Sequence, residues 1–406
     1  MSKIDDLIKE HCPDGVEYKE LQEIFEAKNG YTPSKSNKNF WIDGIVPWFR
    51  MDDIRKNGTI LSESLQQITE EAVKSGRLFP ANSIIISTTA TIGEHALITV
   101  PHLSNQRFTS LSLKPEFSKL LYMRFIYYYC FVLDSWCLAN TNTSSFPSVN
   151  MTGFKRFKFP IPPLPVQQEI VTILDKFTKL EAELETELEA RQRQYAYYRN
   201  SLLSFDEIGG IVESVRWRAL GEVGMYSDTR IDATSLNNDS YVGVDNLLQN
   251  RAGKSASNYV PETGRLTCFK EDDILLGNIR PYLKKIWHSN QKGGTNGDVL
   301  VIRIKQEEKG SISPRYLYQI LADDKFFHYA MKTSKGAKMP RGNKQMIMKY
   351  QIPLPPLEEQ ARIVTILDKF DALVNDISSG LPAEITARRK QYEYYRNRLL
   401  TFREAA

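Results

Sequence analysis

Polar and basic side chains able to bind a nucleic acid gather in several loops of this 406-residue chain. Lysine and arginine bind phosphate oxygens, while asparagine, glutamine and arginine can form paired hydrogen bonds with base edges. In the first half of the chain we predict nucleic-acid contacts at Lys28, Lys35, Lys38, Asn39, Thr89, Thr91, Asn105, Gln106, Arg107, Lys155 and Arg156. In the second half we predict them at Asn278, Arg280, Tyr282, Lys284, Lys285, Asn296, Lys335, Lys338, Arg341, Asn343 and Lys344. One such loop is weak support, since polar basic loops are common, but their presence in both halves strengthens the hypothesis.

The distribution of charge points the same way. The net charge is only +4, but residues 251–350 hold 19 lysines and arginines against 9 acidic residues. Residues 165–205 hold 5 basic residues against 7 acidic ones. A basic excess of this kind favours a polyanionic partner. On charge alone, a basic surface that is merely solvated is the alternative.

No catalytic signature is recognisable in the chain. There is no GxGxxG, and Gly253–Ser255 lacks the upstream glycine of a phosphate-binding loop because position 248 is leucine. The Asn-Pro-Pro-aromatic motif of amino-methyltransferases is absent, and the five histidines have no metal-ligand spacing. Adjacent acidic pairs such as Asp272–Asp273 diverge in a strand. We therefore expect no catalytic residues, no metal and no cofactor bound by this chain.

Composition indicates a cytoplasmic protein. No apolar run approaches the roughly 18 residues of a membrane span, and the N-terminus lacks the apolar core of a signal peptide. The four cysteines show no CxxC pairing and are typical of reduced thiols.

Two nearly identical stretches must position the polar loops. Val171–Phe177 recurs letter for letter at Val364–Phe370, and Gln194–Phe205 recurs at Gln391–Phe402 with three changes in twelve residues. The two offsets are 193 and 197, so the second copy holds four additional residues. This period is too long for a solenoid repeat, and it divides the chain into two tandem halves.

Apolar residues recur through both copies at steps of three and four, which predicts long amphipathic helices that pack on one another. A helix of about 41 residues spans roughly 60 Å. The positions of this seam are Ile173, Leu174, Phe177, Leu184, Leu188, Tyr195, Tyr198, Ile366, Leu367, Phe370, Ile377, Ile385, Tyr392 and Tyr395. Gly380 predicts a break in the second helix, with Pro382 starting a new one. A pair of ordinary core helices is the alternative to a coiled coil.

The remaining patterns indicate strands and helices in both halves. Residues 83–87, 109–113, 241–244, 273–276 and 298–304 have the composition of strands, and residues 120–138 and 316–331 that of helices. We predict an α/β (α+β) fold with two globular regions separated by two long antiparallel coiled-coil helices, related by a pseudo-two-fold repeat. Its parts are an N-terminal helix (1–15), a first globular region (16–159), a first helix (160–205), a second globular region (206–352) and a second helix (353–406).

The repeated segments resemble those of the DNA-specificity subunit of type I restriction–modification enzymes. The resemblance rests on residues 161–177 and 352–370, on Gln-Tyr-x-Tyr-Tyr-Arg-Asn at 194–200 and 391–397, and on residues 30–34. It covers essentially the whole chain. It implies that each globular region is a target-recognition domain for one half of a split sequence in double-stranded DNA. It also implies that the helices set the spacer and dock two methyltransferase subunits through the seam.

The resemblance implies further partners. Restriction subunits with translocase and endonuclease activity join such complexes, and S-adenosylmethionine and ATP are expected on partner subunits only. Two other hypotheses are an enzyme with a cryptic nuclease or methyltransferase centre, and a protein-binding coiled-coil scaffold with no DNA specificity.

Overall fold

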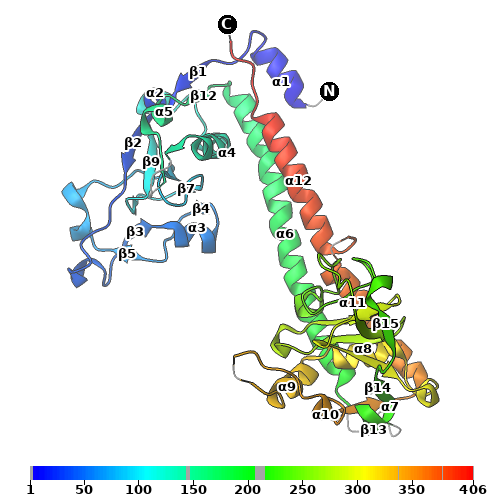
Figure 1. Cartoon of the computed structure of the whole chain (residues 1–406). Helices are drawn as coiled ribbons and strands as arrows, with labels where there is room; N and C mark the ends of the chain where they lie inside the picture. Colours follow the sequence, from blue (N-terminus) through cyan, green and yellow to red (C-terminus); the bar gives the residue numbers. More distant parts are fainter. Residues whose placement is uncertain (1–2, 143–146, 206–214, 337, 377, 406) are drawn as a thin grey trace. The chain divides into compact units, whose positions relative to one another are not determined.

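The computed structural model describes residues 3–142, 147–205, 215–336, 338–376 and 378–405 (Figure 1). The chain divides into two units, each treated by itself. Unit 1 consists of Met1–Ala182 and Ala387–Ala406, and unit 2 consists of Glu183–Thr386. No helix in the described ranges is long and apolar enough to cross a membrane.

Unit 1 is built on a five-stranded sheet with the order β2-β9-β6-β7-β4, beside a three-stranded sheet β5-β3-β8. Its strands and helices up to the first long helix are α1 (Lys3–His11), β1 (Tyr18–Glu20), α2 (Leu21–Ile24), β2 (Phe25–Asn29), β3 (Val46–Phe49), α3 (Met51–Asn57), β4 (Ile60–Leu61), β5 (Gln67–Ile68), β6 (Ser83–Ser87), β7 (His95–Ile98), β8 (Leu103–Ser104), β9 (Phe108–Leu113), α4 (Met123–Ala139), β10 (Thr141–Asn142), β11 (Ser148–Val149), α5 (Met151–Lys155) and β12 (Lys158–Pro160). Strand β6 lies in the middle of the five-stranded sheet, and both of its faces are buried. Ile84 and Ile86 join the core under α4, whereas Ile85 joins the core on the opposite face.

Unit 2 repeats this plan with a four-stranded sheet of order β14-β20-β17-β18 and a three-stranded sheet β15-β16-β19. Its elements are β13 (Arg216–Ala219), α7 (Leu220–Val223), β14 (Gly224–Tyr226), β15 (Arg230–Asp232), β16 (Arg265–Phe269), β17 (Ile274–Gly277), β18 (Ile286–His288), β19 (Gly293–Thr295), β20 (Val299–Ile304), α8 (Pro314–Leu321), α9 (Asp324–Lys332), α10 (Lys344–Ile347), β21 (Gln351–Leu354) and α11 (Leu357–Asn375). Strand β17 is the counterpart of β6. Ile274 and Leu276 face one core and Leu275 the other.

A buried glutamine fixes the start of each long helix. The Gln167 amide donates to the carbonyl oxygens of Leu120 (2.8 Å) and Pro162 (2.6 Å), and its oxygen accepts from the backbone N–H of Tyr122 (2.8 Å). In unit 2 the Gln360 amide donates to the carbonyls of Ser311 and Pro355 and accepts from the Ser313 N–H. These bonds tie the helix to the loop before α4 or α8. Loss of a partner would leave a buried polar group unsatisfied.

Helix α6 (Leu164–Leu203) is 40 residues long and begins in unit 1. There it runs antiparallel to α12 (Leu381–Leu399), with Phe177 stacked on Tyr395 and Glu181 paired with Arg389. In unit 2 the second half of α6 packs antiparallel on α11. The predicted break in the second copy is confirmed, since α11 ends at Asn375 and α12 begins at Leu381.

Two expected elements differ from the structure. Residues 241–244 form no strand. Tyr241 makes only an isolated bridge to Gly294, and the Gly243 N–H bonds the Asn246 side chain, which turns the chain locally. The single helix expected at 316–331 is two helices, α8 and α9, because the Asp323 side chain caps the N-terminus of α9. The strands expected at 83–87, 109–113, 273–276 and 298–304 are confirmed, as is the helix at 120–138, to within a few residues at each end.

Candidate nucleic-acid interface

Hydrogen bonds draw four polar loops of unit 1 together. The Thr32 hydroxyl donates to the Gln106 side chain (2.5 Å), and the Thr88 N–H donates to the Arg107 carbonyl (3.1 Å). Thr89 forms a bridge with Ser148. We define the unit 1 loop cluster as residues 30–41, 88–91, 104–107 and 147–150.

Most of the nucleic-acid contacts predicted for the first half belong to this cluster. Its exposed members are Lys35, Lys38, Asn39, Gln106 and Arg107, whereas Thr89, Thr91 and Asn105 are half-buried. Three predicted residues lie elsewhere. Lys28 pairs with Glu26 on strand β2 at 2.7 Å, and Lys155 and Arg156 are exposed at the end of α5.

Backbone hydrogen bonds also join three loops of unit 2. The Arg280 N–H donates to the Pro340 carbonyl (2.8 Å), and the Gly342 N–H donates to the Asn278 carbonyl (3.0 Å). The Arg341 guanidinium lies 3.2 Å from the Asp298 carboxylate, with 60% of its side chain exposed. We define the unit 2 loop cluster as residues 278–285, 296–298, 333–336 and 338–343.

The predicted residues of unit 2 divide into engaged and available side chains. The Lys285 ammonium donates to the Val244 carbonyl (2.7 Å), and Lys284 lies 2.8 Å from Asp324. Burial and the nearby Arg251 guanidinium lower the pKa of Lys284. The Asn296 side chain closes its own turn and Asn343 caps α10.

Side chains exposed to solvent are those of Arg280, Tyr282, Lys335, Lys338, Arg341 and Lys344. Asn278 is buried, and its side-chain oxygen has no hydrogen-bond partner among the described residues.

Ser148 in unit 1 is structurally equivalent to Arg341 in unit 2. Thr89 bridges Ser148 just as Ile279 bridges Arg341. Two residues after each of them, Asn150 or Asn343 caps the next short helix. Ser148 was not among the predicted contacts because its side chain is small and uncharged. The repeated asparagine cap is the signal that could have found it.

The seam positions contribute mainly to the packing of each unit. Leu174, Leu367 and Ile385 are buried, and the aromatic seam residues stack on one another within their own unit. Ile173, Ile366, Leu184 and Leu188 are half-buried, and Ile377 lies outside the described residues. Two tyrosines outside the seam, at equivalent positions of the repeat, face solvent: Tyr197 (68% exposed) and Tyr394 (60% exposed). These two tyrosines were not predicted because both lie outside the apolar stripe of the helix.

Contacts that occur in both copies of the repeat link the long helices to the globular parts. Asp175 on α6 accepts a hydrogen bond from Arg124 on α4 at 2.8 Å. Its repeat counterpart Asp368 on α11 accepts from Arg315 on α8 at 2.9 Å. The same acidic residue of each copy therefore orients a globular region on its helix.

Known proteins are similar to this chain in sequence. A family model described as "Type I restriction modification DNA specificity domain" matches residues 13–190 and again residues 215–387. The chain belongs to this family. The specificity subunit of the Escherichia coli type I restriction enzyme EcoprrI is 39% identical over 388 residues, which cover 89% of each chain. The Escherichia coli EcoR124I/EcoR124II specificity subunit is 32% identical over 302 residues, 69% of this chain and 71% of the relative.

Solved structures share the specificity-subunit fold. The type I S subunit from M. genitalium matches 95% of this chain and 96% of its own, with a TM-score of 0.54 and 14% identity. A chain from work on complex assembly and conformational transition of the type I R-M system matches 96% of this chain and 98% of its own, with a TM-score of 0.64 and 15% identity. The two matched ranges of the family model correspond to two target-recognition domains.

Proposed function

We propose that this chain is the non-catalytic subunit that gives a type I restriction–modification complex its DNA specificity. Unit 1 reads one half of a bipartite target through its loop cluster, and unit 2 reads the other half. The observation that carries this proposal is that the two units share one backbone arrangement but differ in the residues of their loops. Equivalent bridges hold Ser148 in one unit and Arg341 in the other, so the two units offer different chemistry at the same place.

The repeat also supports two copies of one partner. Nearly identical helices bind two copies of one partner, which we take to be two methyltransferase subunits. Restriction subunits complete the complex, and S-adenosylmethionine and ATP bind to partner subunits only. Two related recognition domains on one chain suit a DNA duplex, whose own two-fold symmetry repeats along its axis.

A protein-binding scaffold with no DNA specificity is the competing function. The exposed basic residues of both loop clusters favour DNA, and salt dependence separates the two functions. Binding through phosphates loses affinity steeply as salt rises, whereas an apolar protein interface does not. We expect the purified chain to bind duplex DNA in this salt-dependent manner, and to transfer no methyl group by itself.

The decisive experiment is a map of modified bases in a host that expresses the methyltransferase subunit with or without this chain. We expect modification at one bipartite motif only when the chain is present. Modification at the same sites without the chain would refute the proposal, and so would a continuous rather than a bipartite motif.

A further inference from the structure

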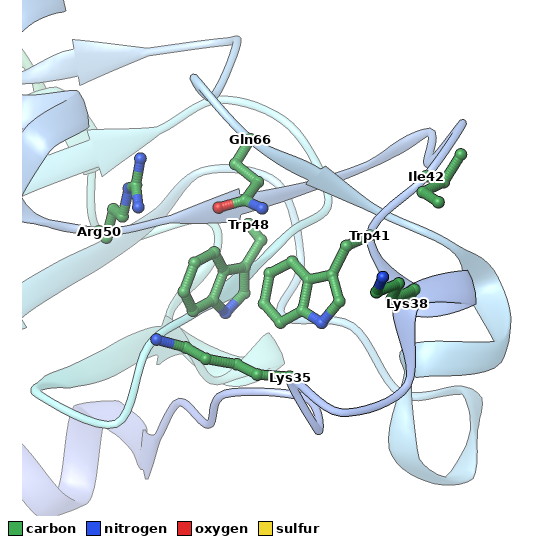
Figure 2. A pocket seen from close by; sticks show the side chains of 7 residues that line it. All are labelled: Lys35, Lys38, Trp41, Ile42, Trp48, Arg50 and Gln66. Atoms are coloured by element: carbon green, nitrogen blue, oxygen red, sulfur yellow. The ribbon is translucent and has the colours of Figure 1, made fainter.

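An amphipathic cavity of about 440 Å³ opens beside the unit 1 loop cluster (Figure 2). The indoles of Trp41 and Trp48 form one wall, with ring centroids 5.0 Å apart and planes inclined by 82°. In Figure 2 the Lys35 side chain runs along the two indoles and Gln66 lies above Trp48. Lys38, Ile42 and Arg50 complete the lining.

The charge of this cavity is entirely positive. Lys35, Lys38 and Arg50 line it, and no carboxylate does. Among the described residues, neither lysine has an ion-pair partner, and the buried Arg50 Nε lacks a hydrogen-bond acceptor. The Arg50 Nε lies 3.4 Å from an Asp52 carboxylate oxygen, and the buried Asp53 carboxylate accepts a hydrogen bond from the Arg50 backbone N–H (2.7 Å). By contrast, a cavity of similar size in unit 2 has a lining of mixed charge, with three aspartates and two arginines. The unit 1 cavity is therefore suited to an anion.

Backbone hydrogen bonds hold both indoles; Trp41 is half-buried and Trp48 is buried (5% exposed). The Trp41 N–H donates to the Ser34 carbonyl (3.1 Å), and the Trp48 N–H donates to the Tyr31 carbonyl (3.0 Å). Their polar atoms are thus satisfied before any ligand arrives. The Gln66 side-chain amide has no hydrogen-bond partner among the described residues, so it can bond a ligand edge with both its donor and its acceptor.

A nucleotide is an anion with a flat apolar face and a polar edge, so it matches the lining of this cavity. A volume of 440 Å³ falls within the range of roughly 300–1,000 Å³ that is usual for small-ligand sites. Base faces are hidden inside a paired duplex, and they become accessible to aromatic side chains only when a nucleotide leaves the stack. An indole-walled cavity therefore does not suit paired DNA.

We propose that this cavity receives one nucleotide of the target DNA that has left the base stack. The base packs on Trp41, Gln66 bonds its edge, and Lys35, Lys38 and Arg50 bind the flanking phosphates. Ile42 lines the cavity and is 57% exposed, and such apolar residues can wedge between base steps. The inference rests on the proposed function, because Lys35 and Lys38 belong to the loop cluster that reads the first half-site.

The test compares three duplexes that differ at one central position. One is fully paired, one carries an unpaired thymidine and one carries an unpaired abasic nucleotide. We measure their binding to the full-length chain by fluorescence anisotropy. The thymidine bulge should bind about tenfold more tightly than either of the others, because stacking is gained and no pair has to be opened. The abasic bulge controls for bending of the duplex and for phosphate contacts alone.

Trp41→Ala should abolish the preference for the thymidine bulge and leave binding to the paired duplex within about twofold. Trp217→Ala is the matched control, since Trp217 is an exposed tryptophan of unit 2 (43%) and should keep the preference. If Trp41→Ala does not fold, the double variant Lys35→Ala/Gln66→Ala takes its place, since Lys35 is exposed and Gln66 half-buried. Equal binding of all three duplexes by the wild-type chain overturns the cavity proposal while leaving the proposed function intact. Binding of none of them overturns both.

Discussion

Phe370 stacks on Tyr198, with ring centroids 5.3 Å apart and planes inclined by 26°. The same contact recurs between Phe177 and Tyr395, at 5.5 Å and 26°. Phe177 and Tyr198 come from the first copy of the repeat, and Phe370 and Tyr395 come from the second. Each unit is therefore built from the start of one copy and the end of the other. Equivalent variants in the two units provide matched comparisons.

The ion pair of Asp368 with Arg315 should stabilise unit 2. Asp368 also accepts from the Gln319 amide at 2.7 Å. Burial lowers the pKa of Arg315 and the hydrogen bond with Asp368 raises it, and the net direction is upward. Both side chains are about one third exposed, so water screens the pair. We expect Asp368→Asn to reduce the stability of unit 2 by about 1–2 kcal/mol.

Hydrogen exchange measured by mass spectrometry would resolve this loss by unit. Asp368→Asn should speed exchange in α8 and leave α4 unchanged. The counterpart variant Asp175→Asn should do the reverse, because Asp175 holds α4 through Arg124. Faster exchange in both helices with either variant would contradict this assignment.

His102 should make the stability of unit 1 depend on pH. Burial lowers the pKa of His102 to about 4, and its ring lies 5.6 Å from the rings of Phe49 and Phe79. Its Nδ1–H donates to the Val100 carbonyl (3.0 Å), and its buried Nε2 has no partner among the described residues. The folded chain thus holds this imidazole neutral.

The direction of the pH effect follows from proton uptake. In the unfolded chain histidine has a pKa near 6.5, so between about pH 6.5 and 4 only the unfolded state gains this proton. Stability should fall as the pH falls through that window, by up to about 3 kcal/mol from His102. Urea unfolding of the wild type and of His102→Phe at pH 7.5 and 4.5 checks this. The variant should show the smaller pH dependence, and equal dependence would refute the role of His102.

Arg341 should contribute to recognition by unit 2 alone. A well-placed arginine contributes about 1–3 kcal/mol to discrimination at a base pair. We expect Arg341→Ala to weaken binding about tenfold or more on duplexes that retain only the half-site of unit 2. Ser148→Ala, at the equivalent place in unit 1, should affect only the other half-site. Competition binding with one half-site randomised measures both effects. Loss at both half-sites, or at neither, would refute the assignment.

Sequence patterns predicted the helices and strands well where a feature of the local sequence determines the structure. The isoleucines of β6 and the Gly380 break are of this kind. A residue at position 380 with a Cβ would place it 2.5 Å from the Ala372 carbonyl oxygen. The helix expected at 316–331 was wrong because one side chain, Asp323, caps a new helix within an otherwise continuous apolar pattern.

Individual site residues were harder to predict because tertiary contacts decide their availability. Lys284 and Lys285 have the composition of phosphate ligands, yet one pairs with Asp324 and the other bonds a carbonyl. The cavity of unit 1 was missed altogether. Trp41, Trp48 and Gln66 are separated along the sequence and meet only when the strands of the smaller sheet pair.

The length of α6 should determine the spacer between the half-sites. Four helical residues add about 6 Å, or roughly two base pairs at ~3.4 Å each. We expect deletion of Glu185–Leu188 to shorten the unspecified gap by about two base pairs, with the half-site sequences unchanged. Sequencing of modified sites measures the gap. Thr186→Ala is the control, because it converts 185–188 into a copy of 181–184 at constant length. An unchanged gap after the deletion would exclude α6 as the ruler.

The exposed tyrosines Tyr197 and Tyr394 should each hold one methyltransferase subunit. They occupy the same position of the repeat and pack edge to face on Tyr198 and Tyr395, which fixes their rings before a partner binds. Exposed, ordered tyrosines are typical interface hot spots, at about 2 kcal/mol or roughly 30-fold in affinity. At limiting concentration, each single alanine variant should therefore bind one subunit instead of two, and the double variant none.

Native mass spectrometry counts the bound subunits directly. Tyr259→Ala is the matched control, since Tyr259 is 70% exposed but lies in unit 2 outside the repeated helices. This variant should still bind two subunits. If Tyr197→Ala and Tyr394→Ala also bind two, the tyrosines are not the docking points. If either single variant binds none, the two sites are not independent, and the repeat does not provide two separate docking surfaces.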